Sequence, residues 1–139
     1  MSDFPQLLSV VLDTTDARGL AEFYRQLLGL SYRPGDEPPP PGQPDPNGQD
    51  WLVLTGAMGS TRIAFQQVTS LPKATWPEGP IPQQLHLDLR VGSKPELDAQ
   101  HERVVGLGAT LLRDMRDRAQ EPICIYADPA GHPFCIFVG

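Results

Sequence analysis

An internal repeat constrains this chain more than any other feature of its sequence. Leu20 matches Leu97 at an offset of 77 residues (97 − 20), and Leu27-Leu-Gly-Leu30 matches Val104-Val-Gly-Leu107 at the same offset. One offset that holds through a helix, its terminal glycine and the next residue indicates two copies of one supersecondary unit. Two unrelated helices that both end in glycine are the alternative explanation. The repeat therefore predicts two tandem modules with the same order of elements.

Each half of the sequence predicts one strand, one helix and three further strands. A βαβββ module covers one face of its sheet with its own helix and needs a second module for the other face. We therefore expect the α+β class: two tandem βαβββ modules forming a cupped, open-barrel mixed sheet that has room for a small molecule. The expected organisation is a single domain over 1–139, with modules at 5–69 and 84–139 and a connector at 70–83.

The first module contains a strongly amphipathic helix. Apolar residues at Leu20, Phe23, Tyr24, Leu27 and Leu28 form one stripe of a helix over 17–28. Asp16 is expected to cap its start and Gly29 to end it. The expected strands are 6–12, 30–33, 51–55 and 61–68. The proline-rich stretch 34–50 lacks apolar periodicity and predicts an exposed, mobile loop, a tolerated insertion rather than a ligand for a partner domain.

The second module ends in a predicted β-hairpin. Asp128-Pro-Ala-Gly131 is turn chemistry between the apolar runs 122–127 and 134–138. Cys124 and Cys135 are placed symmetrically about this turn and could face each other across it. The other expected elements are strands at 85–91 and 109–113 and a helix at 95–105, with Gly106 as its stop. Alternation along the first of these strands puts His86, Asp88 and Arg90 on one face.

Composition and charge exclude several functional classes. The formal net charge is −6, the pI is about 4.9, and the eleven Lys and Arg are scattered. These values argue against nucleic acid and anionic membrane surfaces as partners. The N-terminus lacks the pattern of a signal peptide, and no apolar run approaches a membrane span of about 20 residues. Two cysteines without a secretory signal predict reduced thiols and a cytoplasmic location.

Three motifs together resemble the vicinal oxygen chelate superfamily, which includes glyoxalase I, bleomycin-resistance proteins and extradiol dioxygenases. They are Leu20-Ala-Glu-Phe-Tyr-Arg-Gln-Leu-Leu-Gly-Leu30, His86-Leu-Asp-Leu-Arg-Val91 and the Asp128-Pro-Ala-Gly turn. The resemblance covers nearly the whole chain and is closest to the glyoxalase-like branch. It implies the expected fold, but it does not specify a reaction.

The resemblance also implies where a metal would be held. In the metalloenzymes, the first and last strands of each module carry one ligand each, and these positions fall here on Ser9, Ala64, His86 and Cys135. Gln66 is the polar alternative to Ala64. His86 is the one good ligand among them, whereas hard divalent cations need several oxygen and nitrogen ligands. We therefore expect no cofactor and no metal, with a divalent metal at His86 as the alternative.

The expected ligand-binding cup combines these positions with neighbouring strand residues. Its expected lining is Ser9, Trp51, Ala64, Gln66, His86, Asp88, Tyr126 and Cys135. No catalytic residue is assigned. The candidates are His86, otherwise a hydrogen-bonded interior histidine, and Cys135, otherwise a small buried apolar residue. Trp76 in the connector could fold over the mouth of the cup.

The residues favour binding over catalysis. The first hypothesis is a metal-free protein that holds a small, partly aromatic ligand, as bleomycin-resistance proteins do, and forms a homodimer. One alternative is a metal-dependent lyase, isomerase or dioxygenase of the same superfamily that uses His86. Another is a non-catalytic interaction module.

Overall fold

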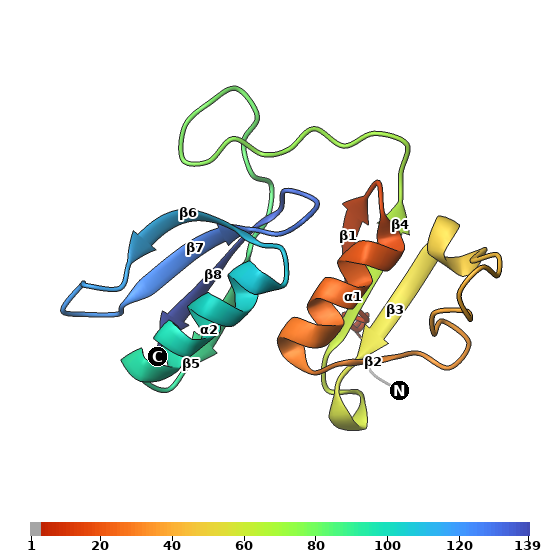
Figure 1. Ribbon diagram of the computed structural model, residues 1–139, viewed down its shortest axis with the longest axis horizontal. Helices are drawn as coiled ribbons and strands as arrows, with labels where there is room; N and C mark the ends of the chain where they lie inside the picture. The colour runs from red at the N-terminus through yellow and green to blue at the C-terminus, as the bar shows by residue number, and fades with distance from the viewer. Residues whose placement is uncertain (1–3) are drawn as a thin grey trace. The chain divides into compact units, whose positions relative to one another are not determined.

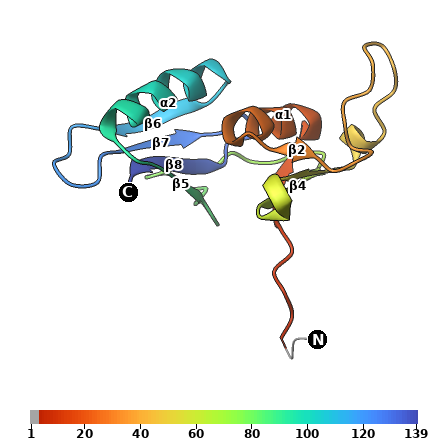
Figure 2. The same cartoon turned by 90° about the horizontal axis from the view of Figure 1, so that it is seen from below.

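The computed structural model describes residues 4–139, which form two compact units. The first unit ends at Ser70 and the second begins at Leu71. Each unit is a four-stranded mixed sheet with one helix on one of its faces (Figures 1 and 2). The predicted α+β class and the two tandem βαβββ modules are confirmed.

The first unit follows the order β1, α1, β2, β3, β4. Its strands are β1 (Val10–Thr14), β2 (Ser31–Tyr32), β3 (Trp51–Thr55) and β4 (Arg62–Gln67), in the spatial order β1-β4-β3-β2. β1 is parallel to β4, and the other pairs are antiparallel. Two 3₁₀ turns, η1 (Asn47–Gln49) and η2 (Ala57–Gly59), lie in the connections. The strand expected at 6–12 is β1, which begins at residue 10 and ends at residue 14. Ser9 therefore lies just before the strand and not within it.

Helix α1 (Ala17–Leu28) has the predicted boundaries. The Asp16 side chain accepts a hydrogen bond from the Gly19 N–H at 3.0 Å, which satisfies one of the free donors at the helix start. Gly29 ends the helix in the left-handed region, with φ of 67°. Inside the unit, Tyr24 is fully buried and stacks on Phe65 of β4, with ring centroids 5.9 Å apart. This contact identifies the face of the first sheet that α1 covers.

The proline-rich stretch 34–50 is tied to α1, so the prediction that all of it is exposed is wrong. Arg18 donates two hydrogen bonds to the Asp45 carboxylate, at 2.8 and 2.9 Å, and a third to the Asp36 carbonyl oxygen at 2.6 Å. The Asp36 carboxylate is buried, accepts from the Val53 N–H at 3.0 Å and pairs with Arg33. The Arg18 hydrogen bonds lower the pKa of Asp45. An insertion that looks structureless in sequence is thus fastened by polar contacts.

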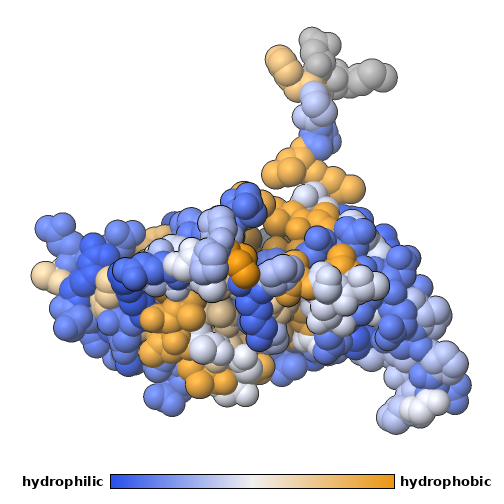
Figure 3. Space-filling view, turned by 90° about the horizontal axis from the view of Figure 1, so that it is seen from above, coloured by the Kyte–Doolittle hydropathy of each residue, from blue (hydrophilic) through white to orange (hydrophobic). Residues whose placement is uncertain are grey.

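The segment before β1 carries exposed apolar side chains. Phe4, Leu7 and Leu8 are 79%, 88% and 70% exposed. Figure 3 shows hydrophobic side chains along the projecting segment. Exposed apolar residues that are close in sequence mark a candidate contact surface.

The second unit repeats the wiring of the first. Its strands are β5 (Leu87–Val91), β6 (Thr110–Met115), β7 (Ile123–Ala127) and β8 (Pro133–Val138), in the spatial order β5-β8-β7-β6. β5 is parallel to β8, and the other pairs are antiparallel. The offset of 77 holds for the ends of β1 and β5: Val10 corresponds to Leu87, and Thr14 to Val91.

Helix α2 (Lys94–Gly106) begins at the position equivalent to the start of α1 but ends differently. Ser93 accepts a hydrogen bond from the Glu96 N–H, and the Glu96 carboxylate accepts one from the Gly92 N–H. The prediction of Gly106 as the stop is wrong, because Gly106 is the last helical residue and the positive φ, 117°, falls on Gly108. The match between Gly29 and Gly106 is therefore one of sequence and not of conformation.

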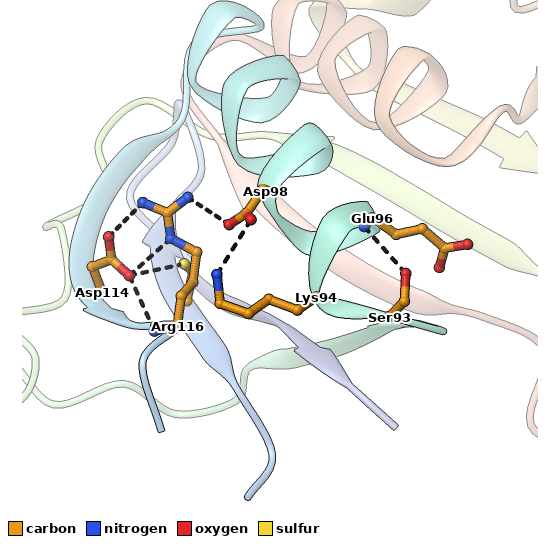
Figure 4. A network of polar contacts seen from close by, with 7 residues as sticks. Ser93, Lys94, Glu96, Asp98, Asp114 and Arg116 are labelled. Atoms are coloured by element: carbon orange, nitrogen blue, oxygen red, sulfur yellow. Dashed lines mark hydrogen bonds and ion pairs between the residues drawn. The ribbon is translucent and has the colours of Figure 1, made fainter. Parts of the chain in front are cut away.

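Polar contacts attach α2 to its sheet. Only Leu97 and Val104 of this helix are buried. Arg116 donates to Asp114 at 2.7 Å and to Asp98 of the helix at 3.1 Å (Figure 4). These contacts lie beside the core of the second unit, which contains Tyr126, Phe134, Leu97, Val104 and Cys124.

The hairpin between β7 and β8 closes the chain as predicted. Asp128 accepts hydrogen bonds from the N–H groups of Ala130 and His132, at 2.9 and 3.0 Å, and Gly131 takes a φ of 97°. The loop includes His132, so its centre lies half a residue later than expected. As a result Ile125, and not Cys124, lies opposite Cys135. The two cysteines project to opposite faces, and both are free thiols.

Neither helix of the described chain has the length and apolar run needed to cross a membrane.

Candidate functional site

The face of the second sheet that points away from α2 collects most of the polar candidates. Tyr126 and Phe134 stack at 5.3 Å, and the Tyr126 hydroxyl lies 2.8 Å from Nδ1 of His101 on α2. These contacts mark the face that α2 covers. Side chains alternate along a strand, so Cys135, which follows Phe134 on β8, points away from α2. The residues paired with Cys135 on the neighbouring strands point away from α2 as well. We call this second surface the open face.

Three strands bring their side chains together on the open face. Cys135 of β8 lies between Asp88 of β5 and Ile125 of β7 in the register of the sheet. Cys135 and Ile125 are buried and form an apolar floor, whereas Asp88 is exposed. His86 precedes β5 by one residue, and its Nε2 lies 3.3 Å from Oδ1 of Asp88. One ligand atom each from His86, Asp88 and Cys135 lies within 4.8 Å of the others.

Burial and the nearby Asp88 carboxylate raise the pKa of the Cys135 thiol to about 11. Both effects disfavour the thiolate form, so the thiol stays protonated near neutral pH. The geometry thus does not favour Cys135 as a nucleophile activated by His86. It favours a neutral thiol in an apolar floor beside an exposed imidazole–carboxylate pair.

Arg113 and Trp76 border the open face at its other side. A bulge in β6 shifts the register between Leu111 and Arg113, and Arg113 lies opposite Ile125. The Arg113 guanidinium carbon is 5.4 Å from the centroid of the Trp76 ring, a cation–π distance. Sequence reasoning did not find Arg113 or Ile125 as site residues. The alternation of β6 could have indicated Arg113, but the bulge interrupts it.

The structure does not bring Tyr126 to this surface. Its ring is fully buried beneath α2, and burial raises the pKa of its hydroxyl. Ile125, and not Tyr126, is the β7 residue beside Cys135 on the open face. We therefore leave Tyr126 out of the candidate site.

The first unit carries the remaining candidates on its own open face. Trp51 lies opposite Gln66, and Ala64 lies between Val53 and Val11, so these side chains point away from α1. Ala64 is buried, Gln66 is exposed, and Ser9 is half-buried two residues before Val11. Ala64 pairs with Val11 as Cys135 pairs with Asp88, which makes Ala64 the counterpart of Cys135. The expectation of one cup lined by both modules stays a prediction.

The donor set does not suit the hard divalent cation that the resemblance implies. Octahedral Mg²⁺ or Mn²⁺ takes several carboxylate, carbonyl or imidazole ligands. The four equivalent positions offer a hydroxyl at Ser9, a methyl at Ala64, an imidazole at His86 and a protonated thiol at Cys135. No reaction step through such an ion follows from these residues.

Solved structures share this fold at low sequence identity. A glyoxalase/bleomycin resistance protein/dioxygenase family enzyme from Burkholderia phytofirmans PsJN has a TM-score of 0.67 and 18% identity, with 96% of this chain and 98% of that chain covered. A mutant of the fosfomycin resistance protein FosX from Listeria monocytogenes, complexed with Mn(II) and 1S,2S-dihydroxypropylphosphonic acid, has a TM-score of 0.67 and 17% identity, with coverage of 98% and 93%.

A lactoylglutathione lyase from Agrobacterium tumefaciens has a TM-score of 0.60 and 19% identity, with 99% of this chain and 96% of that chain covered. No curated protein matches the sequence. The family model of the glyoxalase-like domain matches residues 9–137. The chain therefore belongs to the glyoxalase-like domain family, in the vicinal oxygen chelate superfamily.

Proposed function

We propose that this protein binds a small, partly aromatic ligand on the open face of its second sheet, without a hard divalent metal. One observation carries the proposal: an apolar floor of Ile125 and Cys135 lies between the polar pair His86–Asp88 and the stacked pair Arg113–Trp76. A flat apolar group suits the floor, and polar ends of the ligand suit the two borders.

Two structural neighbours carry drug-resistance names, and sequestering a compound is one way to confer resistance. The Burkholderia phytofirmans neighbour carries bleomycin resistance in its family name, and the Listeria monocytogenes neighbour is named for fosfomycin resistance. A formal net charge of −6 favours cationic ligands through the long-range field. Sequestration of a cationic aromatic compound is the form of this function that the charge supports.

A ligand panel tests the proposal. We expect cationic aromatic compounds to raise the melting temperature of the chelator-treated protein, and added Mn²⁺ to leave the rise unchanged. Trp76→Phe and Arg113→Gln should each weaken binding by roughly tenfold, the equivalent of about 1.4 kcal/mol. Arg103→Gln, on helix α2, is the matched control and should bind normally. Stabilisation that disappears with chelator and returns with Mn²⁺ would overturn the proposal.

An enzyme of the same superfamily is the second candidate. The 3.3 Å contact between His86 and Asp88 favours it, because a carboxylate that orients an imidazole suits an acid–base role. This candidate predicts turnover of a bound compound that His86→Gln abolishes while binding persists. Binding without turnover in the wild-type protein would exclude it for the compounds tested.

We also propose a cytoplasmic homodimer. The exposed Leu7 and Leu8 would be covered in a dimer, and the free thiols suit a reducing compartment. Light scattering should give twice the chain mass. The double substitution Leu7→Ser/Leu8→Ser should shift the mass toward the monomer, and a monomeric wild-type mass at working concentration would count against the proposal.

A further inference from the structure

We propose that Thr75 is a positioning residue of the candidate site, because its hydroxyl holds Trp76 at the border of the open face before a ligand arrives. The connector between the two modules is then a part of the site and more than a link. Sequence reasoning considered Trp76 but gave Thr75 no role. The consequence for ligand affinity rests on the proposed function, whereas the position of Trp76 is a property of the free protein.

Hydrogen bonds between Thr75 and Ile81 close residues 75–81 into a loop. The Thr75 N–H donates to the Ile81 carbonyl oxygen at 2.6 Å. The Thr75 hydroxyl accepts from the Ile81 N–H at 2.9 Å and donates to the Ile81 carbonyl oxygen at 3.1 Å. Two of these bonds depend on the hydroxyl, so a side chain of the same shape without an oxygen atom cannot replace it. The closed loop contains Trp76, whose backbone position the hydroxyl therefore restrains.

Gly79 shows how closely the loop folds onto the Thr75 side chain. Its φ is 126°, in the region that favours glycine. A Cβ atom added to Gly79 would overlap Oγ1 and Cβ of Thr75. Any residue other than glycine at position 79 would therefore displace the Thr75 side chain from its hydrogen bonds. The loop thus combines a specific hydroxyl with the one residue type that lets the backbone reach it.

Contacts on both sides of Thr75 attach the connector to the second unit. The stem of Lys73 packs on Gly131 in the turn between β7 and β8, where an added Cβ atom would lie 2.6 Å from Cγ of Lys73. The Trp76 ring lies 5.4 Å from the guanidinium carbon of Arg113 on β6. Thr75 lies between these two contacts, so its hydrogen bonds set the direction of the chain from the turn toward the border of the open face.

A preformed position of Trp76 increases the affinity for a ligand. An aromatic side chain on a mobile loop loses conformational entropy when a ligand orders it, and this loss weakens binding. The cation–π contact with Arg113 is weak at a half-exposed site and does not restrain the loop backbone. The hydroxyl of Thr75 supplies that restraint in the free protein.

Trp76 fluorescence measures the positioning directly in the free, full-length protein, with Trp51→Phe as the background. Thr75→Val should raise the acrylamide quenching constant of Trp76 roughly twofold and lower its fluorescence anisotropy, because the loop opens locally. Thr75→Ser keeps the hydroxyl and should return both values to those of the background protein. Thr110→Val changes an exposed threonine of the same unit and is the matched control, which should alter neither value. Matching circular dichroism spectra exclude unfolding as the cause.

Calorimetry with N-methylquinolinium, a flat aromatic cation, measures the consequence for binding in the chain with Trp51 intact. Thr75→Val should weaken binding roughly fivefold, and Thr75→Ser should bind as the wild type does. Unchanged quenching in Thr75→Val, or no recovery in Thr75→Ser, would overturn the positioning role. Altered quenching with unchanged affinity would overturn Trp76 as a preformed part of the site. A wild-type protein that binds no cationic aromatic compound would overturn the proposed function, and the quenching measurements would still decide the role of Thr75.

Discussion

Helices α1 and α2 occupy equivalent places in two units of the same wiring, yet different forces hold them on their sheets. α1 buries six side chains, whereas α2 buries only Leu97 and Val104. α2 compensates with two side-chain hydrogen bonds: one between His101 and the Tyr126 hydroxyl, and one that Arg116 donates to Asp98. The repeat thus preserves helix starts and strand register and leaves the chemistry of the interface free to change.

One pair of equivalent positions shows the difference. Tyr24 and His101 are 77 residues apart, and each places a ring 5.9 Å from an aromatic ring of its own sheet. Tyr24 adds apolar burial against Phe65, whereas His101 adds a hydrogen bond to Tyr126. Substitution at the first position should therefore cost more than substitution at the second.

Tyr24→Ala should have the largest effect. Removing a fully buried aromatic side chain creates a cavity and should lower the free energy of unfolding by about 4 kcal/mol. Urea denaturation followed by Trp51 fluorescence, in a Trp76→Phe background, measures the effect within the first unit. A loss below about 1 kcal/mol would show that apolar burial does not hold α1 in place.

His101→Ala should cost about 2 kcal/mol, because it leaves the buried Tyr126 hydroxyl without this partner. Trp76 fluorescence in a Trp51→Phe background measures the second unit. Tyr126→Phe removes the other half of the contact, and a double-mutant cycle should give a coupling of about 1 kcal/mol. Additive effects of the two substitutions would contradict the proposed role of the hydrogen bond.

Local signals in the sequence predicted much of this fold. The Asp16 cap, the apolar stripe and Gly29 gave α1 with its observed boundaries, because each acts within a few residues. The turn at Asp128 gave the closing hairpin for the same reason. Gly106 was a misleading signal, because a glycine after an apolar run is compatible with several helix endings. The glycine with a positive φ is Gly108, two residues later.

The candidate site depends on the register between paired strands, which the sequence constrains less than it constrains helix caps and turns. Counting His132 outside the hairpin loop shifted the expected pairing and suggested a facing pair of Cys124 and Cys135. The neighbour of Cys135 on β5 is Asp88, a pairing between strands more than 40 residues apart that no local pattern reveals. Asp36 was likewise expected in an exposed loop, but it is buried and its carboxylate accepts a hydrogen bond from the Val53 N–H, a contact between residues 17 positions apart.

Arg18→Met tests whether the first unit also relies on polar attachment, at its proline-rich loop. The substitution removes the contacts to Asp45 and Asp36 and should lower stability by about 1–2 kcal/mol. Amide hydrogen exchange over 34–50 should accelerate. Arg25→Met is the control, because Arg25 pairs only with Glu22 among the contacts described for its side chain and lies on the same helix. Equal exchange in both variants would contradict the tether.

Asp114→Asn should have the smallest effect and a definite pH dependence. The hydrogen bonds from Arg116 hold the pKa of Asp114 well below its usual range, and the side chain is 38% exposed, so solvent screening limits the contribution to about 1 kcal/mol or less. A depressed carboxylate pKa stabilises the folded state above the unfolded-state pKa of about 3.9, and this stabilisation is lost as pH falls toward the folded-state pKa.

The stability difference between wild type and Asp114→Asn should therefore be constant from pH 7 to about pH 5 and shrink at lower pH. Urea denaturation at a series of pH values, followed by Trp76 fluorescence, measures it. Asp117→Asn, at the exposed end of the same region, is the control and should show no such trend. A difference that grows on acidification would mean that the carboxylate does not anchor Arg116, and that α2 depends on Leu97, Val104 and His101 alone.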